Sequence, residues 1–440
     1  MAAAMTRPVT VSRRALLAAV ALTSPAAALG RIPYGGRLRL SVPWPITTLD
    51  PAALNDAFSA LFASAVFEPI FALDAAGGAY PTLADSLPIK QATGCRFHLR
   101  PGLKTGAGAA LTAADVAATL ARARTRGGVG VLGELEAPVL STREPLAVLF
   151  PHATPEAVAR ALASPLLALV PRQFSPMAPD GCGAFRVELS RGRALFTRNP
   201  HAARGPAFLD AIEVASVSDL AELLRGFETG RTDVGWFGSG LYRAVKDAVG
   251  FEAPCYGFAA LLAGKSAGAW GAAGTLQALL DAIPAQRLAH LGLRGLPPLA
   301  RGSAAWGGPS TTIAVSSAAP QLVAVARALA ASMTTPGHEL SVTEKSAEEL
   351  ESLRASRQFG LLVDCVRAPS AAPREVELAL RSAASPEVAK RSPRTASAPA
   401  RELGRQLPLG VIGELSVWGA RRAAFDALDA WNLGAVSFRS

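Results

Sequence analysis

The stretch from residue 179 to residue 238 limits the possible folds of this chain most, because its apolar pattern changes period within it. Two alternating runs flank a short SRG turn, and a third run follows a Pro- and Gly-rich link. A helical pattern with apolar residues at i, i+3, i+4 and i+7 comes next: Leu220, Leu223, Leu224 and Phe227. Ser218 is the expected N-cap and Gly230 the expected stop, and the run 233–237 then predicts a strand. A strand, helix, strand unit favours a sheet covered by helices over a bundle or a sandwich.

Four motifs follow one another in this stretch: PDGCGAF (179–185), TRNP (197–200), FLDAIEV (208–214) and LLRGFETGRTDV (223–234). None of them is specific alone, but their order and spacing resemble the family 5 solute-binding proteins of ABC importers, the oligopeptide-, dipeptide- and nickel-binding group. The resemblance continues at residues 95–122, CRFHLRPGLKTGAGAALTAADVAATLAR, which is the most specific block. Thr112 is the expected N-cap of a helix there, so the residues alone predict this helix start, independently of the resemblance.

The resemblance implies an α/β fold of the periplasmic-binding-protein type (class II), with two lobes, an extra subdomain and hinge crossovers. It divides the chain into an export signal (1–30), lobe I (31–53, 171–255 and 408–440), an extra subdomain (54–170) and lobe II (256–407). The region 311–365 reads as strand, helix, strand, helix, strand, which predicts a second α/β unit. The Gly-rich segment 127–133 follows a helix and opens none, so we expect a loop there and no phosphate site.

The N-terminus predicts export. Three arginines, the last two at Arg13 and Arg14, precede an apolar run at 15–22, and Ala26–Ala28 offers small residues for cleavage. SRRALL also matches a twin-arginine signal, so both export routes remain open. The run is too short to cross a bilayer as a mature helix, and we expect a periplasmic protein.

Composition excludes several function classes. An apolar content of 50% with 18% charged residues excludes general disorder, and 440 residues suit two or three lobes. The formal net charge is +10, but the basic residues are scattered and no striped basic face appears, so nucleic acid is not an expected partner. The five histidines are dispersed and no nucleophile has a plausible base, so we expect no metal site, no cofactor and no enzymatic activity.

Four cysteines allow three pairings: Cys95, Cys182, Cys255 and Cys365. All four could also be buried thiols, since cysteine often packs as a small apolar residue. The resemblance favours one disulfide, between Cys255 and Cys365, because relatives carry a bridge at matching places.

The expected ligand site lies between the lobes, the usual place for a small-molecule site. In peptide-binding relatives an aspartate near the end of one strand pairs with the ligand's ammonium group, and aligning Cys365 places Arg367 at that position. A guanidinium there favours a carboxylate or phosphate instead. Asp364 could take the role of the aspartate only if the strand shifts; alternatively, Asp364 caps a turn and Arg367 is solvated. The remaining candidate ligand contacts are Trp44, Asn55, Trp236, Phe237, Tyr242 and Trp306, of which Phe237 and Trp306 could equally be packing residues.

These expectations predict an exported binding protein that captures a peptide-like or other small solute and delivers it to an ABC permease. Hinge closure would trap the ligand. The alternative is a degenerate member that keeps the fold and acts as an interaction or regulatory module. Missing family motifs favour this alternative, because the Asn-Thr and W-x-A-D-Y segments of relatives are absent.

Overall fold

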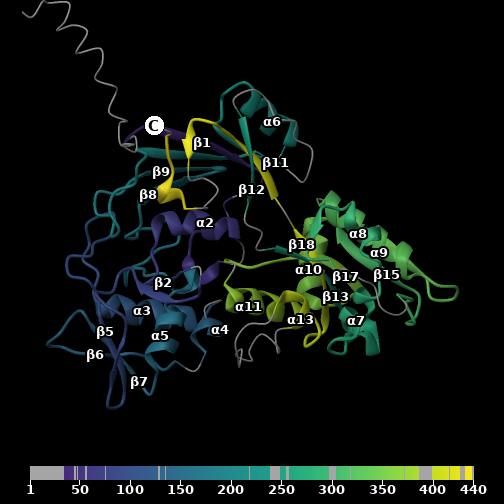
Figure 1. Cartoon of the computed structure of the whole chain (residues 1–440), viewed down its shortest axis with the longest axis horizontal. Helices are drawn as coiled ribbons and strands as arrows, with labels where there is room; N and C mark the ends of the chain where they lie inside the picture. The colour runs from purple at the N-terminus through teal and green to yellow at the C-terminus, as the bar shows by residue number, and fades with distance from the viewer. Residues whose placement is uncertain are drawn as a thin grey trace, which may run out of the picture.

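The computed structural model of the chain is an α/β protein with two principal sheets (Figure 1). It describes residues 34–43, 46, 48–54, 57–74, 76–126, 129–133, 135–217, 219–237, 248–253, 257–296, 304–317, 319–370, 372–385, 399–415, 417–426 and 432–438. The expected export signal lies outside these residues. None of the helices in the described ranges has the length and apolarity needed to cross a membrane.

The first lobe is built on a seven-stranded sheet with the order β12-β19-β11-β1-β10-β9-β8. Its strands are β1 (Arg37–Val42), β8 (Phe185–Ser190), β9 (Arg193–Arg198), β10 (Ala211–Ser216), β11 (Val234–Phe237), β12 (Ala248–Ala253) and β19 (Val417–Arg422). β1 pairs in parallel with β10 and β11, and the hairpin β8–β9 adds the antiparallel edge. The predicted order of strands in residues 179–238 is therefore confirmed.

Helix α6 (Leu220–Glu228) connects β10 to β11, and it begins one residue later than expected. The N-cap is Asp219, whose carboxylate accepts a 2.9 Å hydrogen bond from the Ala221 amide, so the assignment of Ser218 as cap is corrected. A charged acceptor at this position also complements the positive end of the helix. Gly230 ends the turn with a φ of +74°, a conformation in which glycine carries no steric penalty.

The second lobe is built on a six-stranded sheet with the order β14-β18-β13-β17-β15-β16. Its elements are β13 (Gly257–Ala263), η3 (Lys265–Gly271), α7 (Thr275–Asp281), α8 (Gln286–Ala289), β14 (Leu293–Arg294), β15 (Thr311–Ser316), α9 (Pro320–Met333), β16 (Leu340–Lys345), α10 (Ala347–Ser356), β17 (Leu361–Arg367), α11 (Pro373–Ala384), α13 (Ala400–Gly404) and β18 (Leu409–Leu415). The predicted strand, helix, strand, helix, strand order of residues 311–365 is confirmed. β18 pairs with β13 and β14, so the chain returns to the first lobe at β19 and not at residue 408. The local sequence pattern could not predict to which sheet β18 belongs, because the strands that it pairs with are distant in sequence.

The subdomain contains a four-stranded sheet with the order β4-β5-β7-β6. Its elements are β4 (Ile89–Gln91), β5 (Gly94–His98), α3 (Ala113–Arg124), α4 (Val129–Leu132), β6 (Val139–Leu140), β7 (Ala147–Pro151), α5 (Pro155–Ala161) and η2 (Pro165–Leu167). The N-cap of α3 is Thr112, as predicted, and the Asp115 carboxylate accepts hydrogen bonds from its amide and hydroxyl at 2.8 and 2.9 Å. The Gly-rich segment differs from the expected loop, since part of it forms the short helix α4.

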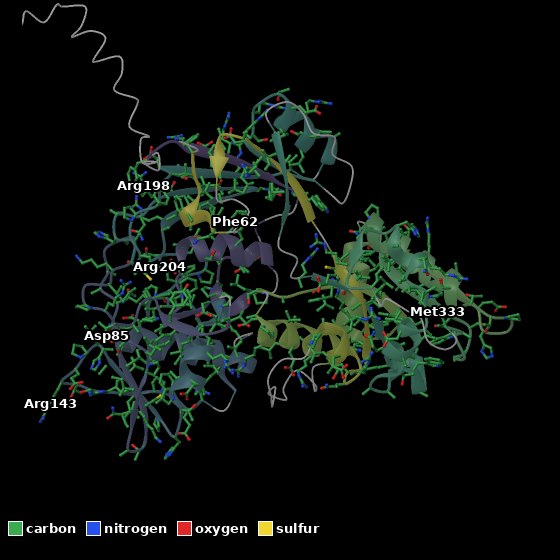
Figure 2. The ribbon with its side chains drawn as sticks, in the orientation of Figure 1. Phe62, Asp85, Arg143, Arg198, Arg204 and Met333 are labelled. Atoms are coloured by element: carbon green, nitrogen blue, oxygen red, sulfur yellow. The ribbon has the colours of Figure 1, made fainter. Side chains whose placement is uncertain are left out.

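One continuous apolar core joins the first lobe and the subdomain. It includes α2 (Ala57–Val66), whose Phe62 stacks on Phe196 of β9 at a centroid distance of 5.9 Å. Figure 2 shows Phe62 beneath the sheet of the first lobe, and Met333 in the second lobe on the other side of the molecule. The remaining short elements around this core are η1 (Pro51–Ala53), β2 (Phe71–Leu73), β3 (Ala79–Pro81), β20 (Phe425–Asp426), η5 (Leu433–Ala435) and β21 (Ser437–Phe438).

Helix α11 packs on both sides of the boundary between the lobes. Val376 and Leu380 belong to the core on one face of the six-stranded sheet, with α10 and α13. Leu378 of the same helix belongs to the core of the first lobe and subdomain. In Figure 1, α11 accordingly lies between α4 and the strands of the second lobe. This arrangement places the helix where it can form the wall of a site between the lobes.

Candidate functional site

A cavity of about 400 Å³ lies along α11, where the second lobe meets the first. Most of its walls come from α10, β17 and α11, and two leucines close it from the other side, Leu54 after η1 and Leu166 in η2. Its volume is within the range of small-molecule pockets. The apolar residues of the second lobe that line it are Leu262, Phe359, Leu362, Val366, Pro369, Leu378, Ala379 and Ala383. The second lobe and the subdomain that shares the core of the first lobe therefore both contribute to this site.

The floor of the cavity is β17, an apolar run with a single acidic residue, LLVDCVR. Successive side chains of a strand point to opposite faces, so Asp364 shares a face with Leu362 and Val366. That face packs against α10 and α11, whereas Leu361, Val363 and Cys365 face the core beneath α9. Asp364 is only 8% exposed, and a buried carboxylate needs a partner.

The partner of Asp364 is Arg354 on α10. Arg354 donates through Nε to Oδ2 at 2.7 Å and through Nη2 to Oδ1 at 2.6 Å, a two-point geometry that fits a guanidinium to a carboxylate. Oδ1 also accepts a 2.8 Å hydrogen bond from the Cys365 amide. The hydrogen bond to Asp364 is the main reason that the pKa of Arg354 is raised, so the guanidinium stays charged at any physiological pH.

Two further arginines line the cavity. Arg357 follows α10 with a φ of +57° and donates to the main-chain oxygens of Ala263 at 2.6 Å and Ala383 at 3.0 Å. These bonds fix its guanidinium in the wall between β13 and α11. Arg367 ends β17 at the rim, where it is exposed. The backbone of Arg367 pairs with Gly257 of β13, while its side chain makes no hydrogen bond or ion pair with any residue that the structure describes.

A second carboxylate of the cavity is Glu375, which is 4% exposed. Its side chain lies beside Ser164, the residue that caps η2, so α11 of the second lobe meets the subdomain here. Burial raises the pKa of Glu375, and the polar interaction with Ser164 opposes that shift. Burial also lowers the pKa of the neighbouring Arg374. The junction between the second lobe and the subdomain therefore contains ionisable groups beside its apolar contacts.

Two of the predicted site residues, Asp364 and Arg367, are among the residues that line the cavity, but their side chains leave β17 on opposite faces. Asp364 lies within β17 and pairs with Arg354, so the interpretation that it caps a turn is wrong. Trp306 lies elsewhere, in the core on the opposite face of the six-stranded sheet. It is 1% exposed, its Nε1 donates to the Pro309 oxygen, and its ring lies 4.2 Å from that of Trp270.

The other predicted contacts cannot be placed against this cavity. The backbone of Trp236 and Phe237 forms the end of β11 in the first lobe. Trp44, Asn55 and Tyr242 lie outside the described residues, although Leu54, which precedes Asn55, lines the cavity. These contacts stay predictions.

The disulfide between Cys255 and Cys365 also stays a prediction, because Cys255 lies outside the described residues. Cys365 is half-buried in β17, and its Sγ lies 3.4 Å from the position of a Cβ on Gly257, two residues after Cys255. Cys95 and Cys182 are buried thiols, and burial raises the pKa of Cys182 to about 12. Such thiols are poor nucleophiles.

Sequence reasoning did not find Arg354, Arg357, Glu375 or Ser164 as site residues. One signal was present: an aspartate inside an apolar strand requires a buried cation or donor nearby. The partner is the arginine ten residues earlier, on the helix that precedes the strand, although Arg357 and Arg367 lie closer to Asp364 along the chain. Glu375 and Ser164 gave no comparable signal, because residues from two lobes form their contact.

No protein-family model matches this chain, and no curated protein matches it by sequence. Solved structures do match. AppA from Bacillus subtilis, solved with a nonapeptide, has a TM-score of 0.70 at 11% identity over 93% of this chain and 100% of its own. NikZ from Campylobacter jejuni, solved with Ni(L-His), has a TM-score of 0.70 at 13% identity over 91% and 99%. The periplasmic binding protein AgaA from A. tumefaciens R10, solved with agropinic acid, has a TM-score of 0.66 at 14% identity over 92% and 99%.

The chain has the α/β fold of the periplasmic binding proteins. These similar structures match over nearly their whole length, so both lobes and the subdomain are part of the shared fold. At this level of identity the similarity concerns the fold, and function has to be argued from the site.

Proposed function

We propose that this chain is an exported solute-binding protein that captures a small ligand in the cavity between its lobes and delivers it to an ABC permease in the inner membrane. The observation that carries the proposal is the composition of the cavity wall, because α10, β17 and α11 of the second lobe face Leu54 and Leu166, which belong to the joint core of the first lobe and the subdomain, across one space. A ligand in that space would contact both lobes and would favour the conformation in which they meet.

The similar structures support a binding role. Their ligands include a nonapeptide, a nickel–histidine complex and agropinic acid, so the fold accepts chemically different solutes. We propose that this chain acts in the same way in the periplasm, without a catalytic step. Its ligand is peptide-like or another small solute.

Ligand-dependent stability tests the proposal. A pool of short peptides, nickel–histidine and small organic acids is added to the purified mature protein, and the unfolding temperature is measured. A ligand that binds only the folded state at a hundred times its Kd adds about 2.7 kcal/mol to the free energy of unfolding. Scattering should show a smaller radius of gyration in the same mixture.

A cavity-filling variant identifies the site. Ala379 lines the cavity, so Ala379→Trp should abolish the stabilisation by ligand. Ala355→Trp is the matched control, since Ala355 is exposed on α10 and does not line the cavity. A stabilisation that survives Ala379→Trp would place the site elsewhere. No stabilisation by any component of the pool would favour the alternative, an interaction module that keeps the fold without transport.

A further inference from the structure

One face of α11 and one face of β17 shape the cavity. The lining residues of α11 fall at i, i+3, i+4, i+7 and i+8, which is a single helix face: Glu375, Leu378, Ala379, Ser382 and Ala383. The lining side chains of β17 that point toward this helix are Leu362, Asp364 and Val366. Alanine at two positions of the helix face leaves room that a larger side chain would fill.

Most of the lining is apolar and buried. Leu262, Phe359, Leu362 and Val366 belong to the core of the second lobe, and Leu54, Leu166 and Leu378 belong to the joint core of the first lobe and the subdomain. The cavity therefore separates two apolar cores. Water is held poorly in such a space, so an apolar ligand gains both burial and contacts there.

The carboxylate that β17 presents to the cavity already has its partners. Both oxygens of Asp364 accept hydrogen bonds from Arg354, and Oδ1 accepts a third from the Cys365 amide. The remaining guanidinium nitrogen of Arg354, Nη1, lies 3.5 Å from Oε2 of Glu351. A ligand cation would have to displace Arg354, and a ligand anion would have to displace Asp364. Either exchange replaces one pair by another, so it adds little affinity.

The other ionisable groups of the lining are also engaged. Glu375 is 4% exposed and lies beside Ser164 of the subdomain. Burial raises the pKa of Glu375, so its carboxyl keeps the proton to a higher pH than an exposed glutamate does. Arg357 donates to the main-chain oxygens of Ala263 and Ala383, and its guanidinium lies 5.8 Å from the centre of the Phe359 ring.

Arg367 does not bring its charge into the space between β17 and α11. Its side chain leaves β17 on the face of Cys365, opposite to Asp364, and its Cγ lies 3.7 Å from the position of a Cβ on Gly257. Within the described part of the chain, the helix face and the strand face consequently present apolar side chains, groups that already have partners and the exposed Ser382 at the edge.

We propose that the cavity binds an uncharged ligand with an apolar body, and that the Arg354–Asp364 pair excludes cationic ligands by occupying the strand carboxylate. A charged group on the ligand would lose its hydration in this space without gaining a partner, which costs free energy. This inference rests on the proposed function and names the class of solute for the same site.

Four probes that share one apolar body test the inference by calorimetric titration of the mature protein at neutral pH: 4-phenylbutan-1-ol, 4-phenylbutyramide, 4-phenylbutyrate and 4-phenylbutylamine. The first two are uncharged at that pH, the third is an anion and the fourth is a cation. We expect both uncharged probes to bind about tenfold or more tightly than either ion, because only the ions pay for an unpaired charge.

Two variants test the role of the Arg354–Asp364 pair. Arg354→Gln leaves the carboxylate without its guanidinium, so the affinity for the amine relative to the alcohol should rise about tenfold. The double variant Arg354→Gln/Asp364→Asn also removes the carboxylate and should return this ratio to that of the parent chain. Circular dichroism checks that both variants are folded, and the order of the four probes in the parent chain decides the class of ligand independently of them.

A second pair of variants assigns the binding to the cavity. Ala379→Trp fills the helix face and should abolish binding of the alcohol and the amide, whereas Ala355→Trp on the exposed side of α10 should retain it. Binding of the uncharged probes that survives Ala379→Trp would overturn the inference, because the probes would then occupy another site.

Equal or tighter binding of either ion would overturn this inference while supporting the proposed function. Failure of all four probes would also overturn it, and the proposed function would then be judged separately by the ligand pool. An unchanged ratio of amine to alcohol in Arg354→Gln would overturn the role of the pair in excluding cations.

Discussion

Arg354 and Asp364 face each other on the cavity wall, joined by hydrogen bonds of 2.6 and 2.7 Å. The carboxylate is 8% exposed, whereas the side chain of the arginine is 42% exposed. The buried carboxylate of β17 is therefore held by a partly solvated arginine of α10. This pairing removes from the cavity the one strand carboxylate that could otherwise receive a ligand ammonium group.

Removing one partner of this pair should destabilise the chain. We expect Arg354→Gln to lower the free energy of unfolding by about 1–3 kcal/mol, because it leaves a buried carboxylate without its charged donor. The double variant with Asp364→Asn should recover part of that loss, since a neutral amide pairs with a neutral partner. Urea denaturation of the two single variants and the double variant measures the coupling, and additive losses would contradict it.

Glu68 should make the stability of the chain depend on pH. Burial raises its pKa to about 7, although Arg204 lies 3.7 Å away and opposes the shift. A carboxyl whose folded pKa exceeds its unfolded value of 4.5 stabilises the protein fully below pH 4.5. That contribution, about 3 kcal/mol, is lost as the pH rises through 7.

The Glu68→Gln variant should not show this loss. Denaturant unfolding at intervals between pH 4.5 and 8 should give a falling free energy for the parent chain and a flatter profile for the variant. Glu144→Gln is the control, because its side chain is 51% exposed. Parallel profiles for the parent and Glu68→Gln would contradict the assignment.

Glu375 should couple contact between the lobes to pH. Burial raises its pKa where it meets Ser164, so the contact is most favourable at low pH and weakens as the pH rises through that raised pKa. Arg374 and Glu377 on the same helix, Arg381 paired with Glu377, and Arg160 near Arg374 complete the charged surroundings.

Hydrogen exchange of α11 should therefore become faster with increasing pH beyond the intrinsic effect of pH on exchange. In Glu375→Gln this additional dependence should disappear, because the amide does not titrate. Glu348→Gln on the exposed side of α10 should retain it. An unchanged profile in Glu375→Gln would show that another group controls the contact.

Gly183 should not tolerate a side chain. A Cβ at this position would lie 2.6 Å from the Val66 carbonyl carbon and 2.7 Å from its oxygen, at the end of α2. Since the obstacle is backbone, we expect Gly183→Ala to cost about 1–3 kcal/mol, measured by thermal or urea unfolding. Gly250→Ala is the control, because nothing lies within 4 Å of its Cβ position. An equal cost in both variants would contradict the steric explanation.

The sequence determined the local elements of this protein. The spacing of Leu223 and Phe227 predicted α6, and Thr112 with Asp115 predicted the start of α3. Neighbours along the chain decide these features, since helix caps and apolar periodicity depend on residues within one or two turns. The ordered motifs also indicated the fold, because their sequence of strands and helices is shared with similar structures.

Only the tertiary structure decided which residues meet. It assigned β18 to the second sheet, placed Trp306 in a core and paired Asp364 with Arg354. It also brought Ser164 and Glu375, more than two hundred residues apart, into one contact. Pairing across sheets and lobes depends on the packing of the whole chain, so local sequence patterns do not determine it.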